Sequence, residues 1–161
     1  MNIYGVCVVQ DEADVIRESL SRAARFCKRI RVWDLGSTDG TWEILQSLAS
    51  DQIEVVRKEG LPYTSSLRGN IAAEIRGQVE AGAWIYILDA DEFLVGDPGP
   101  ILAAAEQEGA SLVGVWQANF FPTPQTLDEI QRLGEESWAR QPLPDRFRHY
   151  RVEWFEWRFV R

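Results

Sequence analysis

Three carboxylates stand within four residues directly after an apolar run in the stretch YILDADEFLV, residues 86–95. Asp89 and Asp91 are two residues apart, so in an extended chain they point the same way, and the small Ala90 points opposite. Two carboxylates that face one spot repel each other unless a cation lies between them. Oxygen ligands without a nearby His or Cys favour Mg²⁺ or Mn²⁺ over zinc. The pattern predicts a divalent-metal site at Asp89 and Asp91, with a simple strand-end cap as the alternative.

A second polar stretch, DLGSTDGT, follows another apolar run. Its glycines permit tight turns, and Ser37, Thr38 and Asp39 can cap the helix that follows. Turn formation accounts for these capping residues. Asp34 ends the apolar run, where its carboxylate can accept hydrogen bonds from a base or a ribose. Asp34 is therefore predicted to contact a ligand.

Arg68 lies near the start of a predicted helix, in the stretch SLRGN. Backbone N–H groups at a helix start and a guanidinium both suit phosphate. Alone, Arg68 would be interpreted as a surface residue. Beside an Asp-x-Asp metal site it predicts contact with a diphosphate or a nucleotide.

The elements that must position these residues alternate between strand and helix. Apolar, β-branched runs predict strands, and apolar residues at helical spacing predict helices. The expected order is strand 2–9, helix 11–27 with Asp11 as its N-cap, strand 29–34, helix 41–49, strand 52–58, helix 66–82 and strand 83–89. This order indicates an α/β fold, a Rossmann-like, mostly parallel sheet with helices on both faces. Such sheets bind ligands outside the carboxyl ends of their strands, which is where the polar stretches fall.

The rest of the chain predicts a helix at 99–109, a strand at 111–121, a polar excursion with a short helix at 126–133, and a final strand at 150–161. Phe155, Trp157 and Phe159 alternate along the final strand and are predicted to face the core, with a sugar-stacking platform as the alternative. The chain stops at the end of this strand without a closing turn, so a fragment of a longer enzyme is expected. If left exposed at a sheet edge, these aromatics also raise a homodimer as a hypothesis.

Composition and charge restrict the class of protein. The chain of 161 residues is 45% hydrophobic and 26% charged, which predicts one globular domain. The net charge of −8 argues against nucleic acid as a partner. No signal peptide and no apolar run of membrane-spanning length stand out, so a cytoplasmic protein without a transmembrane segment is expected. Cys7 and Cys27 are isolated in apolar surroundings and predict buried thiols.

Three stretches together resemble the nucleotide-sugar-binding half of family 2-like glycosyltransferases of the GT-A fold: VVQDEADVIRESL, VWDLGSTDGTWEIL and LRGNIAAEIRGQVEAGAWIYILDADEFL. The resemblance covers roughly residues 2–120. It implies a nucleotide-sugar-binding half at 1–120 and the incomplete start of an acceptor-side region at 121–161, within a single structural domain.

The resemblance also implies roles for individual residues. The nucleotide-binding set would be Gln10, Glu12, Asp34, Ser37, Arg68 and Asp89, with Mn²⁺ or Mg²⁺ held by Asp91 and Asp89. Within that set Asp34 would meet the base, and Leu35 stands where the family usually has a second acid.

The implied activity is metal-dependent, inverting transfer of a sugar from a nucleoside-diphosphate sugar to an acceptor hydroxyl. UDP-sugar is the default donor, and the acceptor could be a glycan, a lipid or a protein. The general base is unassigned, because neither the lone His149 nor any of the late acids Glu135, Glu136, Asp145 and Glu153 is distinguished by the sequence.

Three other classes compete with this interpretation. A sugar-nucleotide nucleotidyltransferase would need a basic, glycine-rich loop after the first strand, where this chain has QDEADVIRE. A receiver domain or aspartyl-phosphate phosphatase would need a lysine at a late strand, but Lys28 and Lys58 both come early. A non-catalytic module that binds a sugar nucleotide or a partner stays open.

Overall fold

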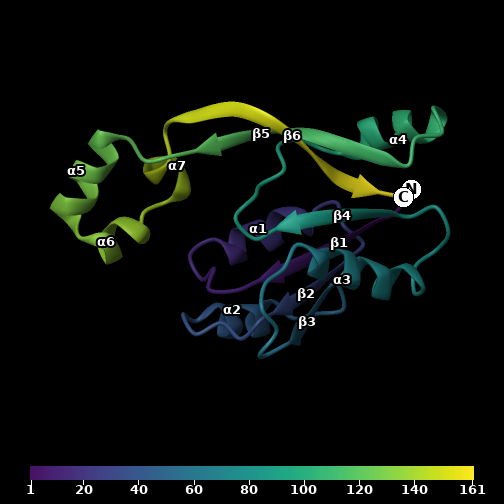
Figure 1. Cartoon of the computed structure of the whole chain (residues 1–161), viewed down its shortest axis with the longest axis horizontal. Helices are drawn as coiled ribbons and strands as arrows, with labels where there is room; N and C mark the ends of the chain where they lie inside the picture. Colours follow the sequence, from purple (N-terminus) through teal and green to yellow (C-terminus); the bar gives the residue numbers. More distant parts are fainter. The chain divides into compact units, whose positions relative to one another are not determined.

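The computed structural model describes all residues, 1–161, and confirms the alternation of strands and helices (Figure 1). The elements are β1 (Ile3–Val9), α1 (Ile16–Ala23), β2 (Arg29–Asp34), α2 (Thr41–Leu48), β3 (Ile53–Arg57), α3 (Ser66–Arg76), β4 (Trp84–Asp89), α4 (Gly99–Gln107), β5 (Leu112–Phe120), α5 (Pro124–Leu133), α6 (Glu135–Ala139), α7 (Leu143–Arg146) and β6 (Tyr150–Val160). They fall into two compact units, Met1–Val113 with Trp157–Arg161, and Gly114–Glu156.

The strands form a mainly parallel sheet in the order β3-β2-β1-β4-β6-β5. β1 pairs in parallel with both β2 and β4, and β2 pairs in parallel with β3, while β6 runs antiparallel to β4. The strand order reverses on either side of β1, which creates a topological switch point between β1 and β4. The predicted α/β, Rossmann-like class is therefore confirmed, and the switch point is where such sheets bind ligands.

Helices pack on both faces of the sheet. On one face the alternate β1 residues Tyr4, Val6 and Val8 form a core cluster with Ile71 and Ile75 of α3. Alternate residues of a strand lie on one face of the sheet, and helix residues three or four apart lie on one stripe, so the two sets of side chains contact each other along their length. The opposite face is buried by α1, through residues that include Ile16, Leu20 and Ala23. β1 and β4 therefore lie between two layers of helices, with α3 on one face of the sheet and α1 on the other.

Two predicted helices have different bounds from those expected. α1 begins at Ile16 after the N-cap Val15, so the prediction of Asp11 as N-cap is wrong. Asp11 has a positive φ of 56°, a backbone conformation that interrupts a helix, and its side chain makes contacts outside α1 instead. α3 ends at Arg76 with Gly77 as C-cap, six residues before the end that the sequence predicts.

The final strand is only partly a core strand. Phe159 is fully buried and stacks on Tyr86 with the ring centroids 4.8 Å apart. Phe155 and Trp157 are 46% and 57% exposed, so the prediction that they face the core is wrong. The reason is register: β4 pairs with β6 at Val160 and Phe159, the last residues of the strand.

Further expectations are also tested by the fold. Both cysteines are buried free thiols, as predicted. The short helix expected at 126–133 is present as α5, which begins two residues earlier because Thr123 caps it and Pro124 occupies its first position. None of the helices has the length and apolarity of a membrane span.

Candidate functional site

The parallel register brings three acid-bearing strand ends to one edge of the sheet. Val9 of β1 lies beside Asp34 at the end of β2. Val8 of β1 lies beside Asp89 at the end of β4. The chain after β1, from Gln10 onward, therefore leaves the sheet between the two acids, and Gln10 itself is exposed.

Asp34 is a fully buried carboxylate that organises its own loop. Its Oδ1 accepts hydrogen bonds from the backbone N–H groups of Gly36 at 3.0 Å and Ser37 at 3.1 Å. Its Oδ2 accepts the hydroxyl hydrogen of Ser37 at 2.5 Å. Gly36 has a φ of +97°, which a residue with a side chain adopts only under strain. Asp34 is 0% exposed, and its contact with a base stays a prediction.

The loop after β2 is tied to the loop after β1. The backbone N–H of Asp11 donates to Ser37 Oγ at 2.9 Å, and Asp11 Oδ1 accepts from the N–H of Thr38 at 2.7 Å. The N–H of Glu12 donates to Thr41 Oγ1 at 2.8 Å. These cross-loop bonds hold the backbone of Glu12 near the buried Ser37, so these two residues, both predicted as nucleotide ligands, belong to one hydrogen-bonded network.

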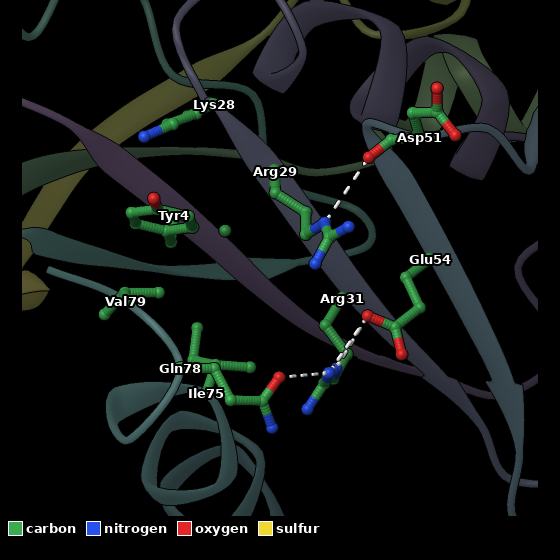
Figure 2. A pocket seen from close by; sticks show the side chains of 10 residues that line it. Tyr4, Lys28, Arg29, Arg31, Asp51, Glu54, Ile75, Gln78 and Val79 are labelled. Atoms are coloured by element: carbon green, nitrogen blue, oxygen red, sulfur yellow. Dashed lines mark hydrogen bonds and ion pairs between the residues drawn. The ribbon is translucent and has the colours of Figure 1, made fainter.

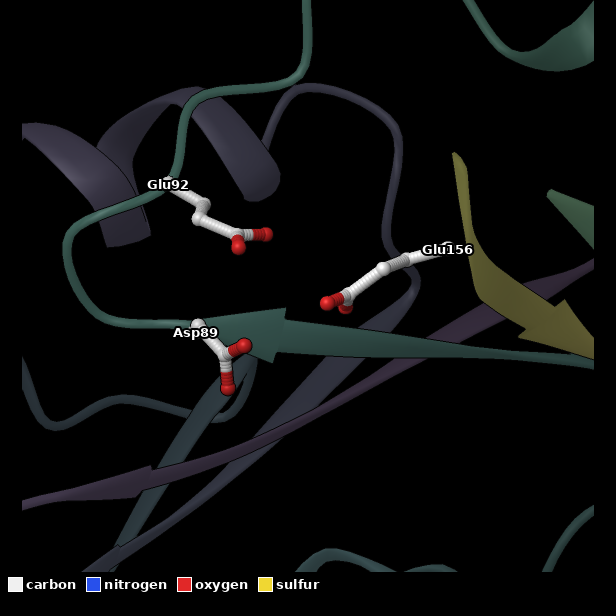
Figure 3. Close-up of side chains that lie close together, drawn as sticks. All are labelled: Asp89, Glu92 and Glu156. Atoms are coloured by element: carbon white, nitrogen blue, oxygen red, sulfur yellow. The ribbon is translucent and has the colours of Figure 1, made fainter. Parts of the chain in front are cut away.

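Asp89 lies between two guanidinium groups. Arg68 Nη1 of α3 donates to Asp89 Oδ1 at 2.7 Å and to Oδ2 at 2.6 Å. Arg158 Nη1 of β6 donates to the same Oδ2 at 3.0 Å, while its Nη2 donates to Glu92 Oε1 at 2.5 Å. The structure thus brings together Arg68 and Asp89, both predicted from the sequence, and adds Arg158, which was not. Figure 3 shows Asp89 at the end of β4 and Glu92 in the loop that follows.

Asp91 is the exposed member of the Asp-x-Asp pair, whereas Asp89 is half-buried. Burial, followed by the negative charge of Asp91, raises the pKa of Glu12 from 4.5 to about 7. Burial and the charges of Asp89, Glu12 and Asp91 likewise raise the pKa of the Cys7 thiol on β1. The negative charges of carboxylates at the ends of β1 and β4 therefore act on the same group, the thiol of Cys7.

This donor set fits a hard divalent cation. The acids supply oxygen ligands only, and Mg²⁺ or Mn²⁺ commonly takes one or two carboxylates and leaves its other positions to phosphate and water. Burial raises the pKa of Glu12 first, and the negative charge of Asp91 adds to that shift, which a cation bound near Asp91 would oppose. The carboxylate oxygens of Asp89 and Glu92 lie within 4.8 Å of each other. The assignment of the ion to Asp91 and Asp89 stays a prediction.

Glu12 predicts a pH dependence of stability in the metal-free protein. Its pKa of about 7 in the folded state exceeds the ordinary 4.5, so between these values the folded protein binds more protons than the unfolded chain. The free energy of unfolding therefore has a component that falls as pH rises from about 4.5 to about 7. We expect Glu12→Gln to remove that component, measured by urea unfolding in EDTA across this window. The same pH slope in wild type and variant would contradict the raised pKa.

A cavity of about 300 Å³ lies at the other end of the strands and is unrelated to the acids (Figure 2). It is lined by residues at the starts of β1, β2 and β3 and at the end of α3. Arg31 in its wall donates to Glu54 at 3.0 Å and to Gln78 at 3.0 Å. These bonds satisfy the charge of Arg31 within the protein, so we assign the cavity no role in the candidate site.

The fold and the strand-end acids agree with a comparison to known families. The chain matches the model of glycosyl transferase family 2 over residues 6–159 and belongs to that family. The resemblance stated from the sequence is thereby confirmed. The activity, the donor, the acceptor and the metal are matters for a proposal.

Two further comparisons, with curated proteins and with solved structures, are less informative than the family match. No curated protein matches the chain at a significant level. Among solved structures, the crystal structure of a 4-diphosphocytidyl-2C-methyl-D-erythritol synthase is similar, with 12% sequence identity and a TM-score of 0.49. The match covers 78% of this chain and 65% of the synthase chain, so this chain spans less than two thirds of that protein's length.

Proposed function

We propose that this domain binds a nucleoside-diphosphate sugar, UDP-sugar by default, at the carboxyl ends of β1, β2 and β4. A sugar then passes to an acceptor hydroxyl with the help of Mn²⁺ or Mg²⁺. The observation that carries the proposal is the Arg68–Asp89 ion pair, with the exposed Asp91 two residues further along the chain, at the switch point of a family 2 fold. Opposite charges placed side by side suit a diphosphate bound through a cation.

Different residues of the chain would bind different parts of the donor. Asp91, with Asp89, would hold the cation, which supplies charge stabilisation for the departing diphosphate when bound. Each carboxylate oxygen has two lone pairs, so Asp89 can accept from arginine and still coordinate. The Arg68 side chain is 23% exposed, and a guanidinium is a favoured partner of phosphate oxygens.

The nucleoside part would rest on the joined loops after β1 and β2. Gln10 and Glu12 would line this pocket, and Ser37 and Asp34 would shape its floor, with Asp34 as the residue proposed to meet the base. The hydrogen bonds between the loops support this assignment, because they make the backbone of the pocket rigid before a ligand binds. Direct displacement with inversion also requires a general base, for which no residue is proposed.

One observation weakens the nucleotidyltransferase alternative. The loop after β1 carries Asp11, Glu12 and Asp14 and has no glycine. A triphosphate placed on this loop would meet carboxylates instead of backbone N–H groups and cations. A diphosphate bound at Arg68 avoids that repulsion.

The proposal is tested by the release of nucleoside diphosphate from a panel of sugar nucleotides in the presence of Mn²⁺. Most glycosyl transfer sites leak slowly to water without an acceptor, so we expect slow hydrolysis of one donor. We expect Asp91→Asn to remove it, while Asp128→Asn, an exposed aspartate on α5, leaves it unchanged. Binding of a sugar nucleotide without any release would favour the non-catalytic module instead.

The homodimer stays a prediction. Trp116, Tyr150 and Trp154 are 69%, 59% and 53% exposed on β5 and β6. Aromatic side chains left exposed on long strands are a common basis for self-association. We expect the sedimentation coefficient to rise with protein concentration and Trp154→Ser to reduce that rise. A monomer at every concentration would remove the hypothesis.

A further inference from the structure

Arg158 is an almost completely buried arginine whose partners are the acids at the end of β4. Its side chain is 3% exposed, and it lies in β6 between the exposed Trp157 and the buried Phe159. A charge buried in an apolar strand costs several kcal/mol unless it is paired and hydrogen-bonded. Asp89 at 3.0 Å and Glu92 at 2.5 Å supply that pairing, so β6 is joined to the loop after β4 by two charge-assisted hydrogen bonds.

The two contacts bracket Asp91 in the sequence. One guanidinium holds Asp89 on its N-terminal side and Glu92 on its C-terminal side, and the backbone N–H of Glu92 donates to the carbonyl of Asp89 at 3.1 Å. The turn that carries Asp91 is therefore closed by a backbone hydrogen bond and by a side-chain clamp. Without the clamp, the carboxylates of Asp89 and Glu92, whose oxygens lie within 4.8 Å of each other, would repel.

The contact between Arg158 and Asp89 also makes Arg68 easier for a ligand to bind. Asp89 Oδ2 accepts from both arginines, so its charge is shared between them and does not bind Arg68 exclusively. A phosphate that approaches Arg68 then competes with a carboxylate that is already neutralised from the other side. This arrangement lowers the cost of transferring Arg68 from Asp89 to a diphosphate.

We propose that Arg158 is a positioning residue of the donor site, which holds Asp89 and the turn bearing Asp91 in the geometry that binds a metal–nucleotide complex. The inference rests on the proposed function, because it assigns Arg158 a part in that same site. In this role Arg158 itself touches neither metal nor nucleotide. Residues that orient metal ligands typically change metal affinity by 10- to 100-fold when replaced.

The test compares Arg158→Met with wild type in calorimetric titrations of UDP, once with Mn²⁺ and once with EDTA. We expect Arg158→Met to lose about tenfold or more of the affinity measured with Mn²⁺, and to leave any affinity measured in EDTA unchanged. A purely structural role would lower the affinity measured with Mn²⁺ only in proportion to a loss of folded protein, which the thermal midpoint reports. Arg161→Met, which removes an exposed arginine next to the same strand end, serves as the matched control and should match wild type.

Two further variants decide the remaining outcomes. Arg158→Lys keeps the charge but loses the fork that reaches both acids, so we expect a folded protein of intermediate Mn²⁺-dependent affinity. In an Asp89→Asn background, Arg158→Met should have a smaller effect than in wild type, because one of the two carboxylates through which the arginine acts has already lost its charge. If Arg158→Met does not fold, unchanged affinity in Arg158→Lys would overturn the inference. Absence of UDP, GDP and dTDP binding in wild type would instead reject the proposed function, and with it this role.

Discussion

Replacement of Asp91 by alanine should remove metal-dependent nucleotide binding and leave the fold intact. Asp91 is exposed, so its loss should remove the proposed metal ligand without disturbing the core. Loss of residues that only orient a metal ligand costs 10- to 100-fold in affinity, so we expect loss of the ligand itself to cost about 100-fold or more. Free Mn²⁺ counted by electron paramagnetic resonance, with UDP present, measures the effect.

The same variant carries its own structural control. Asp91 raises the pKa of Glu12, so its removal should bring that pKa down and leave the free energy of unfolding unchanged or slightly higher. Asp128→Ala is a matched removal of an exposed aspartate away from the strand ends and should bind Mn²⁺ and UDP as wild type does. Equal Mn²⁺ binding by Asp91→Ala and Asp128→Ala would place the cation elsewhere.

Replacement of Asp34 by alanine should destabilise the protein strongly. Three donors point at this buried carboxylate: the N–H groups of Gly36 and Ser37 and the hydroxyl of Ser37. Alanine leaves these donors without their acceptor, and each buried donor left unsatisfied typically costs about 1–3 kcal/mol. The free energy of unfolding from urea titration is the measurement.

Asp34→Asn removes the negative charge at this position and keeps the shape of the side chain. Asparagine retains one carbonyl oxygen that can accept from the two backbone N–H groups, but its amide cannot accept the hydrogen of Ser37. We expect a smaller loss of stability than for alanine, with nucleotide affinity reduced through the altered loop. A urea midpoint of Asp34→Ala equal to that of wild type would show that the loop does not depend on this carboxylate.

Much of the site could be predicted from local sequence. The acids Asp34 and Asp89 each end an apolar β-branched run, and parallel pairing necessarily brings the carboxyl ends of such runs to one edge. Arg68 at the start of a helix is placed by the same rule. Strand alternation and helix order are local properties, so the α/β class follows from them.

Other features depend on contacts between distant parts of the chain. Arg158 and Asp89 are 69 residues apart, and only their pairing in space explains an arginine in an aromatic strand. An arginine flanked by Trp157 and Phe159 was the one available signal. Likewise, the expectation that Asp11 caps α1 followed local preference, whereas the structure gives its carboxylate to Thr38 of the neighbouring loop.

The burial of a side chain is the property that its position at the end of a strand predicts least well. Asp34 and Asp91 both follow apolar runs, yet one is fully buried and the other exposed. The difference arises from the turns: Gly36 and Ser37 fold back over Asp34, while Asp91 lies beyond the end of β4. The alternation that predicted a core role for Phe155 failed for a related reason, since pairing with β4 extends over only part of β6.

The central claim, a metal-dependent nucleotide site at the ends of β1, β2 and β4, is tested most directly by calorimetric titration of wild-type protein with UDP, GDP and dTDP. Each nucleotide is titrated once with Mn²⁺ and once with EDTA. We expect one nucleotide to bind, UDP by default, and EDTA to remove the binding. Binding of equal strength in EDTA, or no binding of any nucleotide to the folded protein with Mn²⁺, would contradict the claim.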